Sequence, residues 1–415
     1  MKALVVERSV PRFAAARVAS AFGSGRGAGI GPLRLTDRDA PPLPGPGWHR
    51  VRPVLSGICG SDLATLDGRS SRYFEDLVSF PFVPGHEVLG VLDEPAAGAG
   101  GETLAAGTRV VIEPVLGCAA RGIEPPCAAC AAGQVGGCRH TAFGHLRPGL
   151  QTGYCADTGG GWSEAGLVAH HSQIHPVPGE LSDADAVTVE PVACAVHAAM
   201  AAAVREGDVV AVLGAGTVGL ATTAALAHLG ATGRLARPGA LLVGARYPVQ
   251  RQLAEELGAT SALPADQLGR AVRRATGSLV VGRAGRLTGG ADVVFDCAGN
   301  AASLEQSLSL VRPRGQVVLV GMPGRVHVDL APLWHREVTL TGAYAYGTEQ
   351  AGRRRAVRSF ELAMEVAAAL GTGRLVSATY PLDRFEEAIA HAGAAGRRGG
   401  VKVAFDLRDA KGRAR

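Results

Sequence analysis

The residues best suited to chemistry are a cysteine and a histidine in two short glycine-containing turns. Cys59 lies in Ser56-Gly-Ile-Cys-Gly-Ser-Asp62, and His86 lies in Pro84-Gly-His-Glu87. Zinc binds thiolate, imidazole and carboxylate groups, and a catalytic zinc keeps one coordination position open. Cys59 and His86 therefore predict two ligands of a reacting metal, and the third ligand must come from elsewhere in the chain.

A second motif predicts a dinucleotide site. An apolar strand at 209–213 runs into the pattern Gly-x-Gly-x-x-Gly, and an apolar helix follows. The first glycine allows the tight turn, the second lets the backbone approach a pyrophosphate, and the third lets the helix pack close to the strand. The helix N-terminus then stabilises the phosphate charge. The residues predicted to bind the dinucleotide are Gly214, Ala215, Gly216, Thr217, Val218 and Gly219.

The end of the next predicted strand bears on the choice of cofactor. Sites that prefer NAD place an acidic residue there, which binds the ribose 2′-hydroxyl. This strand ends in Val243-Gly-Ala-Arg-Tyr247, with Arg246 and no acidic residue. A guanidinium can bind a 2′-phosphate through two hydrogen bonds. The sequence thus predicts NADP as the favoured cofactor over NAD, and an Arg246 that faces solvent or stacks on adenine would instead leave dual specificity.

The third metal ligand is expected at the start of the helix that leads into this dinucleotide domain. Glu190 lies there, in Val189-Glu-Pro-Val-Ala-Cys194. This location predicts that Glu190 lies at the domain cleft, where a metal and a nicotinamide must meet. Cys194 follows one helical turn later on the same face and is the competing candidate. We predict Glu190.

The elements that must position these residues change in character along the chain. Short predicted strands at 51–56, 83–91 and 108–113 are separated by Gly- and Pro-rich loops, which is typical of a β-rich domain. Further on, strands and helices alternate, as expected for βαβ units and a parallel sheet. The alternating elements are predicted at 209–213, 217–229, 240–243, 248–257, 293–296, 304–310 and 316–320.

These patterns predict a catalytic domain at 1–185, a doubly wound α/β (Rossmann) dinucleotide-binding domain at 186–345, and a segment at 346–415 that returns to the first domain. The returning segment is expected to begin with a helix at 356–369. Residues 8–34, which are rich in Arg, Ala, Ser and Gly, are expected to form an inserted surface loop.

Composition excludes several classes of function. The net charge of +5 is spread along 415 residues, and the one dense basic run, Arg353–Arg355, lacks interleaved aromatic residues. We therefore expect no nucleic-acid partner. No apolar stretch is long enough to cross a membrane. Eight cysteines in a long chain without a secretory pattern favour metal binding over disulfides and a cytoplasmic location.

Together the motifs resemble the zinc-containing medium-chain dehydrogenase superfamily, which includes alcohol, sorbitol, threonine and archaeal glucose dehydrogenases. The matching stretches are Gly57–Asp62, Pro84–Glu87, Glu190–Pro191, Gly214–Gly219, Asp296–Gly299 and Val320–Met322. The resemblance covers nearly the whole chain. It implies a GroES-like β-rich catalytic domain in front of the Rossmann domain, and it indicates the superfamily much more specifically than the substrate.

The resemblance also implies roles for single residues. Cys59, His86 and Glu190 would bind the catalytic zinc. Ser61 would hydrogen-bond the substrate oxygen and start its proton path, and Asp62 and Glu87 would orient His86 or the metal. Several relatives carry a relay histidine three residues after the Ser61 position. This chain has Ala64 there, so water or another group must carry the proton away.

A structural zinc lobe at 114–140 is a further implication of the resemblance. The superfamily's lobe uses four cysteines separated by two, two and seven residues. Cys127, Cys130 and Cys138 match the last two gaps, whereas Glu124 occupies the first position. Cys118 could loop back and complete a four-thiolate site. We predict Cys118 as the fourth ligand, with Glu124, or a lobe without metal, as the alternatives.

The sequence as a whole predicts a zinc-dependent oxidoreductase that transfers a hydride between NAD(P) and an alcohol or polyol, or its carbonyl product. The alternatives are an aldose (glucose-type) dehydrogenase and a zinc-free quinone or enoyl reductase. Zinc-free relatives lack the cysteine and histidine ligands, so Cys59 and His86 argue against the latter. The resemblance, and a predicted edge strand at 338–344, suggest a homodimer or homotetramer acting on a small alcohol, polyol or sugar.

Overall fold

The computed structural model describes residues 1–282, 285–351 and 355–408. Its contacts divide the chain into two units. Unit 1 comprises Met1–Glu190, Thr372–Arg398 and Lys402–Arg415, and unit 2 comprises Pro191–Gly371 and Gly399–Val401. These boundaries fall later than the predicted ones at 185/186 and 345/346, because the segment up to Gly371 packs within unit 2.

Unit 1 is built on a seven-stranded sheet of order β20-β21-β3-β4-β7-β9, in which β8 also pairs with β3. Its strands are β3 (Trp48–Gly57), β4 (Val88–Leu92), β7 (Arg109–Ile112), β8 (Leu167–His170), β9 (Ile174–Pro176), β20 (Val376–Tyr380) and β21 (Lys402–Asp406). The C-terminal strand β21 pairs antiparallel with β3, with Ala404 opposite Gly57. The tail thus returns to the first part of the chain and lies beside the turn that carries Cys59.

The predicted strand at 83–91 is wrong over its first half. Strand β4 begins only at Val88, because Gly85 has a φ of +97°, a value outside the strand region and tolerated mainly by glycine. A Cβ atom at Gly85 would also clash with the Trp162 ring. His86 and Glu87 therefore lie in the turn that precedes the strand, where their side chains are buried.

The expected surface loop at 8–34 contains a helix, so that prediction is also wrong. Strands β1 (Lys2–Val6) and β2 (Leu33–Asp37) pair antiparallel, and helix α1 (Val10–Ser20) lies between them with a proline in its first turn. The segment after α1 is anchored, since Ser24 Oγ and Gly25 N both donate hydrogen bonds to the buried Asp67 carboxylate.

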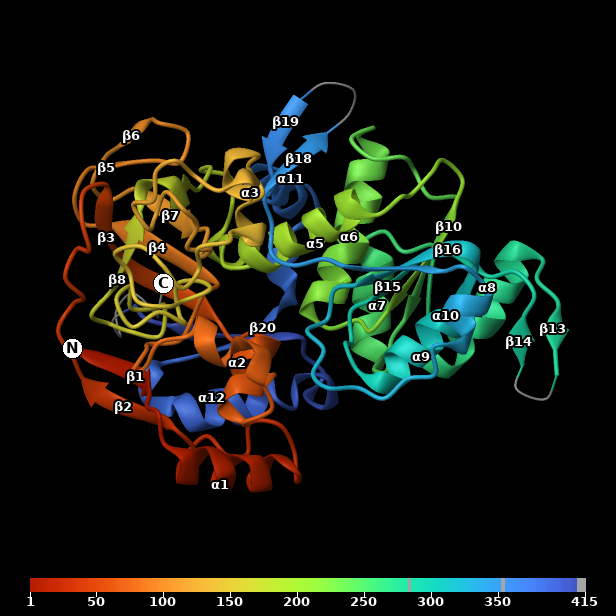
Figure 1. Cartoon of the computed structure of the whole chain (residues 1–415), viewed down its shortest axis with the longest axis horizontal. Coiled ribbons are helices and arrows are strands. Elements are labelled where there is room, and N and C mark those ends of the chain that lie inside the picture. Colours follow the sequence, from red (N-terminus) through yellow and green to blue (C-terminus); the bar gives the residue numbers. More distant parts are fainter. Residues whose placement is uncertain (283–284, 352–354, 409–415) are drawn as a thin grey trace. The chain divides into compact units, whose positions relative to one another are not determined.

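Unit 2 contains a six-stranded parallel sheet of order β12-β11-β10-β15-β16-β17, flanked by helices (Figure 1). Its strands are β10 (Val209–Leu213), β11 (Ala240–Gly244), β12 (Ser261–Leu263), β15 (Ala291–Asp296), β16 (Val311–Leu319) and β17 (Thr339–Gly342). This order reads 3-2-1-4-5-6 along the chain, which is the doubly wound dinucleotide-binding arrangement. Strand β17 forms one edge of the sheet.

The helices include those predicted at 217–229, 248–257 and 304–310, with small shifts at their ends. They are α4 (Asp183–Ala186), α5 (Val189–Ala201), α6 (Thr217–Ala231), α7 (Pro248–Glu256), α8 (Leu268–Thr276), α9 (Ala301–Leu310), α10 (Ala331–His335), α11 (Ser359–Leu370) and α12 (Phe385–Ala392). Smaller elements are α2 (Gly60–Leu66), α3 (Ala128–Ala131), β5 (Ala96–Ala97), β6 (Thr103–Leu104), β13 (Val280–Val281) and β14 (Arg286–Leu287).

The helix predicted at 356–369 begins three residues late. Strands β18 (Thr348–Ala351) and β19 (Arg355–Arg358) form an antiparallel pair before it, and α11 starts at Ser359. The Ser359 hydroxyl donates hydrogen bonds to the Gly347 carbonyl and the Glu349 carboxylate, which ties the helix start to the hairpin. Arg353 and Arg354 of the basic run lie outside the described residues.

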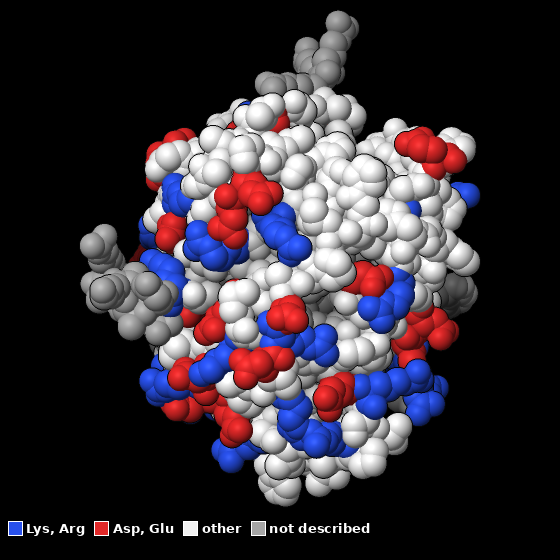
Figure 2. Space-filling view, turned by 90° about the vertical axis from the view of Figure 1, so that its left-hand side faces the viewer, with Lys and Arg blue, Asp and Glu red and all other residues white. Residues whose placement is uncertain are grey.

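Within the described ranges, every helix is too short or too polar to span a bilayer. On the face of the molecule drawn in Figure 2, positive and negative side chains are interspersed.

A group of histidines surrounds Trp48 where β3 pairs with β8. His170 is buried, and its ring packs edge-on against Trp48 with 5.8 Å between centroids. Burial, reinforced by the charges of His171, His49 and His145, lowers the pKa of His170 to about 4. His170 is therefore neutral in the folded protein at pH 7, with Ser172 hydrogen-bonded to its Nδ1 atom.

This arrangement predicts that acid destabilises the fold through His170. Its folded pKa lies below the ordinary value of 6.5, so its stabilising contribution is complete above pH 6.5 and is lost as the pH falls toward 4. The test variant is His170→Asn, which keeps a polar atom near the Nδ1 position. Between pH 7 and 4.5, the free energy of unfolding measured with urea should fall by about 2 kcal/mol more in the wild type than in this variant. Identical pH profiles for the wild type and the variant would contradict this expectation.

Candidate active site

The first half of the candidate active site is the turn between β3 and α2. Cys59 caps the N-terminus of α2, and its backbone N–H donates a 2.9 Å hydrogen bond to the Asp62 carboxylate. The preceding Gly57 is required there, because a Cβ atom would clash with the Glu87 carboxylate. Ile58 N–H donates to the Val403 carbonyl of β21. The C-terminal strand thus fixes the turn that presents the Cys59 thiol.

The second half is the turn before β4, which brings His86 and Glu87 to Cys59. One potential ligand atom from each of these three residues lies within 4.8 Å of the other two. His86 Nδ1 lies 3.5 Å from Asp62 Oδ1. Burial would lower the pKa of His86, but the Asp62 and Cys59 charges outweigh it and raise that pKa well above its ordinary value. The structure therefore brings together the two residues from which the sequence argument started.

A buried lysine completes this cluster, and the sequence argument missed it. Lys402 is the first residue of β21, is 2% exposed, and forms an ion pair with Glu87. Its Nζ also donates a 3.3 Å hydrogen bond to the Ile58 carbonyl. Burial would lower the pKa of Lys402, but the negative groups of Glu87, Cys59 and Glu190 raise it above its ordinary value. The sequence offered no local signal for it, since charged residues occupy both ends of β21.

Two carboxylates compete to be the third ligand. Glu87, which the resemblance assigned to an orienting role, lies within ligand distance of Cys59 and His86. Its Oε1 atom is buried without a hydrogen-bond partner among the described residues. Glu190, the predicted ligand, is buried at the start of α5 and close enough to act on the charge of Lys402. It lies outside the three-residue group, so its role as a ligand stays a prediction.

Tyr154 is a second residue that the sequence argument missed. Its ring lies between those of Phe82 and His86, with centroid distances of 5.3 and 5.8 Å. Its hydroxyl donates a 3.2 Å hydrogen bond to Asp62 Oδ1 and also hydrogen-bonds the Ser61 side chain. Ser61 is the residue predicted to hydrogen-bond the substrate oxygen. Tyr154 therefore links it to Asp62, whose carboxylate lies beside His86.

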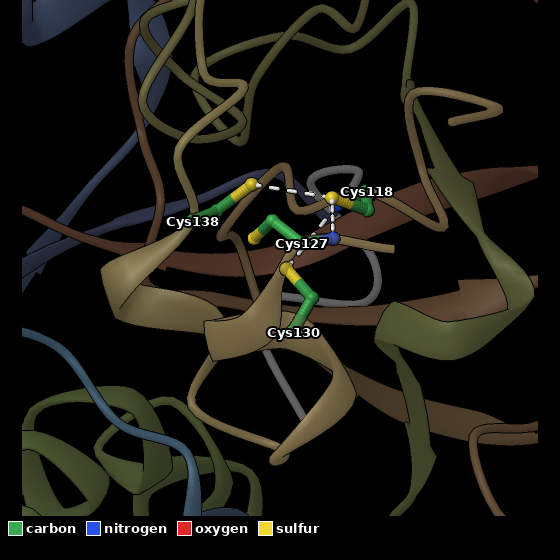
Figure 3. Close-up of side chains that lie close together, drawn as sticks. All are labelled: Cys118, Cys127, Cys130 and Cys138. Carbon is green, nitrogen blue, oxygen red and sulfur yellow. Dashed lines mark hydrogen bonds between the residues drawn. The ribbon is translucent and has the colours of Figure 1, made fainter. Parts of the chain in front are cut away.

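The predicted structural lobe brings four thiols together (Figure 3). The sulfur atoms of Cys118, Cys127, Cys130 and Cys138 all lie within 4.8 Å of one another. The Cys118 and Cys138 sulfurs are 3.7 Å apart, close to the separation of about 3.8 Å that tetrahedral zinc with bonds of about 2.3 Å imposes. Glu124 is exposed and lies outside this group. The geometry fits a four-thiolate site that includes Cys118.

The surroundings act differently on the four thiols: backbone hydrogen bonds favour the ionised form of Cys127, whereas burial raises the pKa of Cys130 and Cys138. Cys127 N–H donates to Cys118 Sγ, and His140 N–H donates to Cys138 Sγ. Hydrogen bonds from the backbone of Arg139 and Cys130 lower the pKa of Cys127 to about 6. The fully buried Arg121 contributes a positive charge beside this cluster and donates hydrogen bonds to surrounding carbonyls. Such surroundings stabilise the negative charge that a four-thiolate metal site carries.

Unit 2 carries the glycine-rich turn between β10 and α6. Gly214 has a φ of +90°, and a Cβ atom at Gly219 would clash with the Gly214 carbonyl oxygen. Gly216 caps α6, and a Cβ atom there would meet nothing within 4 Å. The first and third glycines are thus required by the fold, whereas the second leaves open space beside a helix N-terminus. This is the arrangement in which a helix binds a pyrophosphate.

Two arginines lie at the carboxyl end of β11. Arg246 Cζ lies 5.7 Å from the centroid of the neighbouring Tyr247 ring. Arg251 donates hydrogen bonds to the carbonyls of Ala245 and Arg246 from the first turns of α7. These contacts hold the short connection that carries Arg246.

Comparisons with known proteins identify the family. Residues 45–179 match the alcohol dehydrogenase GroES-like domain, and residues 217–361 match the zinc-binding dehydrogenase domain. An L-idonate 5-dehydrogenase from Vitis vinifera is 30% identical over 77% of this chain and 78% of its own length. A sorbitol dehydrogenase from Bacillus subtilis is 28% identical over 71% of this chain and 74% of its own.

Among solved structures, a zinc-binding dehydrogenase from Sinorhizobium meliloti bound to NADP is 27% identical to this chain. The match covers 90% of this chain and 95% of that protein, with a TM-score of 0.65. The chain belongs to the zinc-binding dehydrogenase family. It is an NAD(P)-dependent oxidoreductase of the zinc type, with a GroES-like domain and a Rossmann domain. The predicted family, fold and class of reaction are confirmed.

The thiol cluster predicts a distinctive response to substitution. We expect the wild type to hold about two zinc ions per chain and Cys118→Ser to hold about one, because a serine hydroxyl is a poor zinc ligand. The melting temperature of Cys118→Ser should lie about 5 °C or more below that of the wild type. Glu124→Gln is the matched control and should leave both quantities unchanged. Loss of zinc in Glu124→Gln, with full zinc in Cys118→Ser, would reverse the ligand assignment.

Proposed function

We propose that this enzyme oxidises a secondary alcohol group of a small polyol or sugar acid with NADP, and catalyses the reverse reduction. The observation that carries the proposal is the buried group of Cys59, His86 and Glu87, one thiolate, one imidazole and one carboxylate within reach of a single ion. The relatives named as sorbitol and L-idonate dehydrogenases support the substrate class.

The donor set fits a catalytic zinc. Cys59 and His86 would hold the ion with a carboxylate from Glu87 or Glu190, which leaves a coordination position open. Asp62 beside His86 Nδ1 leaves the other ring nitrogen for the metal. When bound, the zinc would supply Lewis acidity that makes the substrate hydroxyl a stronger acid.

The remaining steps belong to the residues of the chain. Ser61 would accept the proton of the substrate hydroxyl. Lys402 would hold the Glu87 carboxylate in place, since an unpaired buried carboxylate is costly. The turn at Gly214–Gly219 and the N-terminus of α6 would bind the pyrophosphate of the dinucleotide, whose nicotinamide carries the hydride. We also propose that the exposed edge β17 pairs with that of a second copy to form a homodimer.

The substrate class can be tested with a panel of polyols, sugar acids, simple alcohols and aldoses assayed with both dinucleotides. We expect specificity constants (kcat/KM) for polyols or sugar acids at least about tenfold above those for simple alcohols, because a site with polar groups discriminates against analogues that lack the partner hydroxyls. Chelation should abolish activity, and added zinc should restore it, except in Cys59→Ser. A preference for aldoses, or turnover of quinones after complete zinc removal, would favour the alternative functions.

The cofactor preference depends on Arg246. We propose that its guanidinium binds the 2′-phosphate of NADP, since no acidic residue occupies this strand end. Arg246→Ala should lower kcat/KM for NADP by about 10- to 100-fold and leave that for NAD nearly unchanged, which makes NAD the internal control. An equal loss with both cofactors would show a structural role only, and a wild-type preference for NAD would refute the proposal.

A further inference from the structure

We propose that Tyr154 and Thr65 form the proton path from the substrate oxygen to solvent, in place of the relay residue that is missing at Ala64. The path would run from Ser61 through the Tyr154 and Thr65 hydroxyls to Ser70. This inference rests on the proposed function, in which Ser61 receives the proton of the substrate hydroxyl.

The spacing on α2 provides the first support. Ser61 and Thr65 are four residues apart in this helix and therefore lie on the same face. Ala64 has no group that can carry a proton, whereas Thr65, one position later, supplies a hydroxyl. Both Ser61 and Thr65 are half-buried, so neither side chain is fully exposed to bulk water.

Tyr154 connects these two residues from the opposite side. Its hydroxyl hydrogen-bonds the Ser61 side chain and lies 3.5 Å from Thr65 Oγ1. The ring is held by Phe82 and His86, so the hydroxyl has little freedom to move away. A phenolic oxygen can accept one hydrogen bond while it donates another, and this is what a proton relay requires.

The outer end of the path is also defined. Thr65 Oγ1 lies 3.0 Å from Ser70 Oγ, and Ser70 is partly exposed. Ser70 N–H and Arg69 N–H both donate hydrogen bonds to the Ala64 carbonyl. Arg69 is in turn bound to Asp67 and to Ser24 of the N-terminal insertion. The insertion therefore helps to fix the loop at which the proton would leave.

The buried Asp62 is the nearby alternative acceptor, because Tyr154 donates to it in the structure. Asp62 already accepts from Cys59 N–H and faces His86, so a proton left there would weaken the hold on His86. A phenolic oxygen can accept one proton while it releases its own, so Tyr154 would pass a proton on without a change of its net charge.

One proton travels the whole path for each alcohol group that is oxidised. The substrate O–H bond breaks and its proton moves to Ser61 Oγ, while the hydrogen on the alcohol carbon leaves with its electron pair to the oxidised nicotinamide. The Ser61 proton moves to Tyr154, that of Tyr154 to Thr65, that of Thr65 to Ser70, and that of Ser70 to water. Every hydroxyl on the path ends with one proton, and one proton appears in solution for each hydride transferred.

Thr65→Val tests the path, because valine has the shape of threonine without the hydroxyl. We expect kcat for alcohol oxidation to fall by about 10- to 100-fold, with KM, zinc content, melting temperature and NADP binding unchanged. The solvent deuterium isotope effect on kcat should increase, and small buffer bases such as formate or imidazole should restore part of the rate. Thr65→Ser, which keeps a hydroxyl, should recover most of the rate, and Thr103→Val on the remote strand β6 controls for the type of substitution.

The outcomes separate this inference from the proposed function. A Thr65→Val enzyme with the rate and isotope effect of the wild type would overturn the path. If Thr65→Val loses zinc or stability, Ser70→Ala at the partly exposed end gives the decisive result by the same measurements, and an unchanged isotope effect there overturns the path. A wild type that oxidises no polyol or alcohol would instead refute the proposed function, and the Ser61 end of the path with it.

Discussion

The ion pair between Lys402 and Glu87 is the interaction on which the arrangement of the candidate active site depends. Both side chains are almost fully buried, and a buried charge is tolerated only when it is paired. Lys402 can reach Glu87 because β21, the returning C-terminal strand, pairs with β3 beside the Cys59 turn. The same strand holds Ile58, so one pairing positions the thiolate, the carboxylate and the counter-charge together. Removing Lys402 would leave several negative groups facing one another in the core.

The two cysteine-containing sites differ in their number of thiols and in the role expected of each. The four thiols of the lobe form a closed set whose negative charge is stabilised by backbone N–H groups and the buried Arg121. A closed site contributes to folding and offers no position to a substrate. The group of Cys59, His86 and Glu87 has fewer donors, one of which is already held by Lys402. Under the proposed function, a zinc held by this group would keep one coordination position open, and the substrate would bind there.

The sequence predicted those features that local pattern determines. The strand at 209–213 and the following glycine turn were correct because alternating βα units and glycine geometry are local properties. The Cys59 and His86 turns were found because their residue types are rare in combination. Whether Glu87 or Glu190 is the third ligand stays a prediction, because nothing in the sequence shows which carboxylate a turn directs inward.

Lys402 and Tyr154 could not be predicted because their roles arise from distant pairing. Lys402 contacts Ile58 across 344 positions, and Tyr154 contacts Asp62 across 92. The helix α1 was missed because its Arg- and Ala-rich sequence has no clear apolar face, and the segment after it is anchored by a residue distant in the chain, Asp67. Arg353 and Arg354 lie outside the described residues, so the expectation for that run stays a prediction.

The central claim, that one chain holds a closed four-thiolate zinc and an open zinc with a single thiolate, is tested most directly by zinc X-ray absorption on the fully loaded enzyme. We expect about two zinc ions per chain with an average of about 2.5 sulfur ligands each, the remainder being nitrogen and oxygen. About one zinc per chain with four sulfur ligands would contradict it, because Cys59 and His86 would then hold no metal.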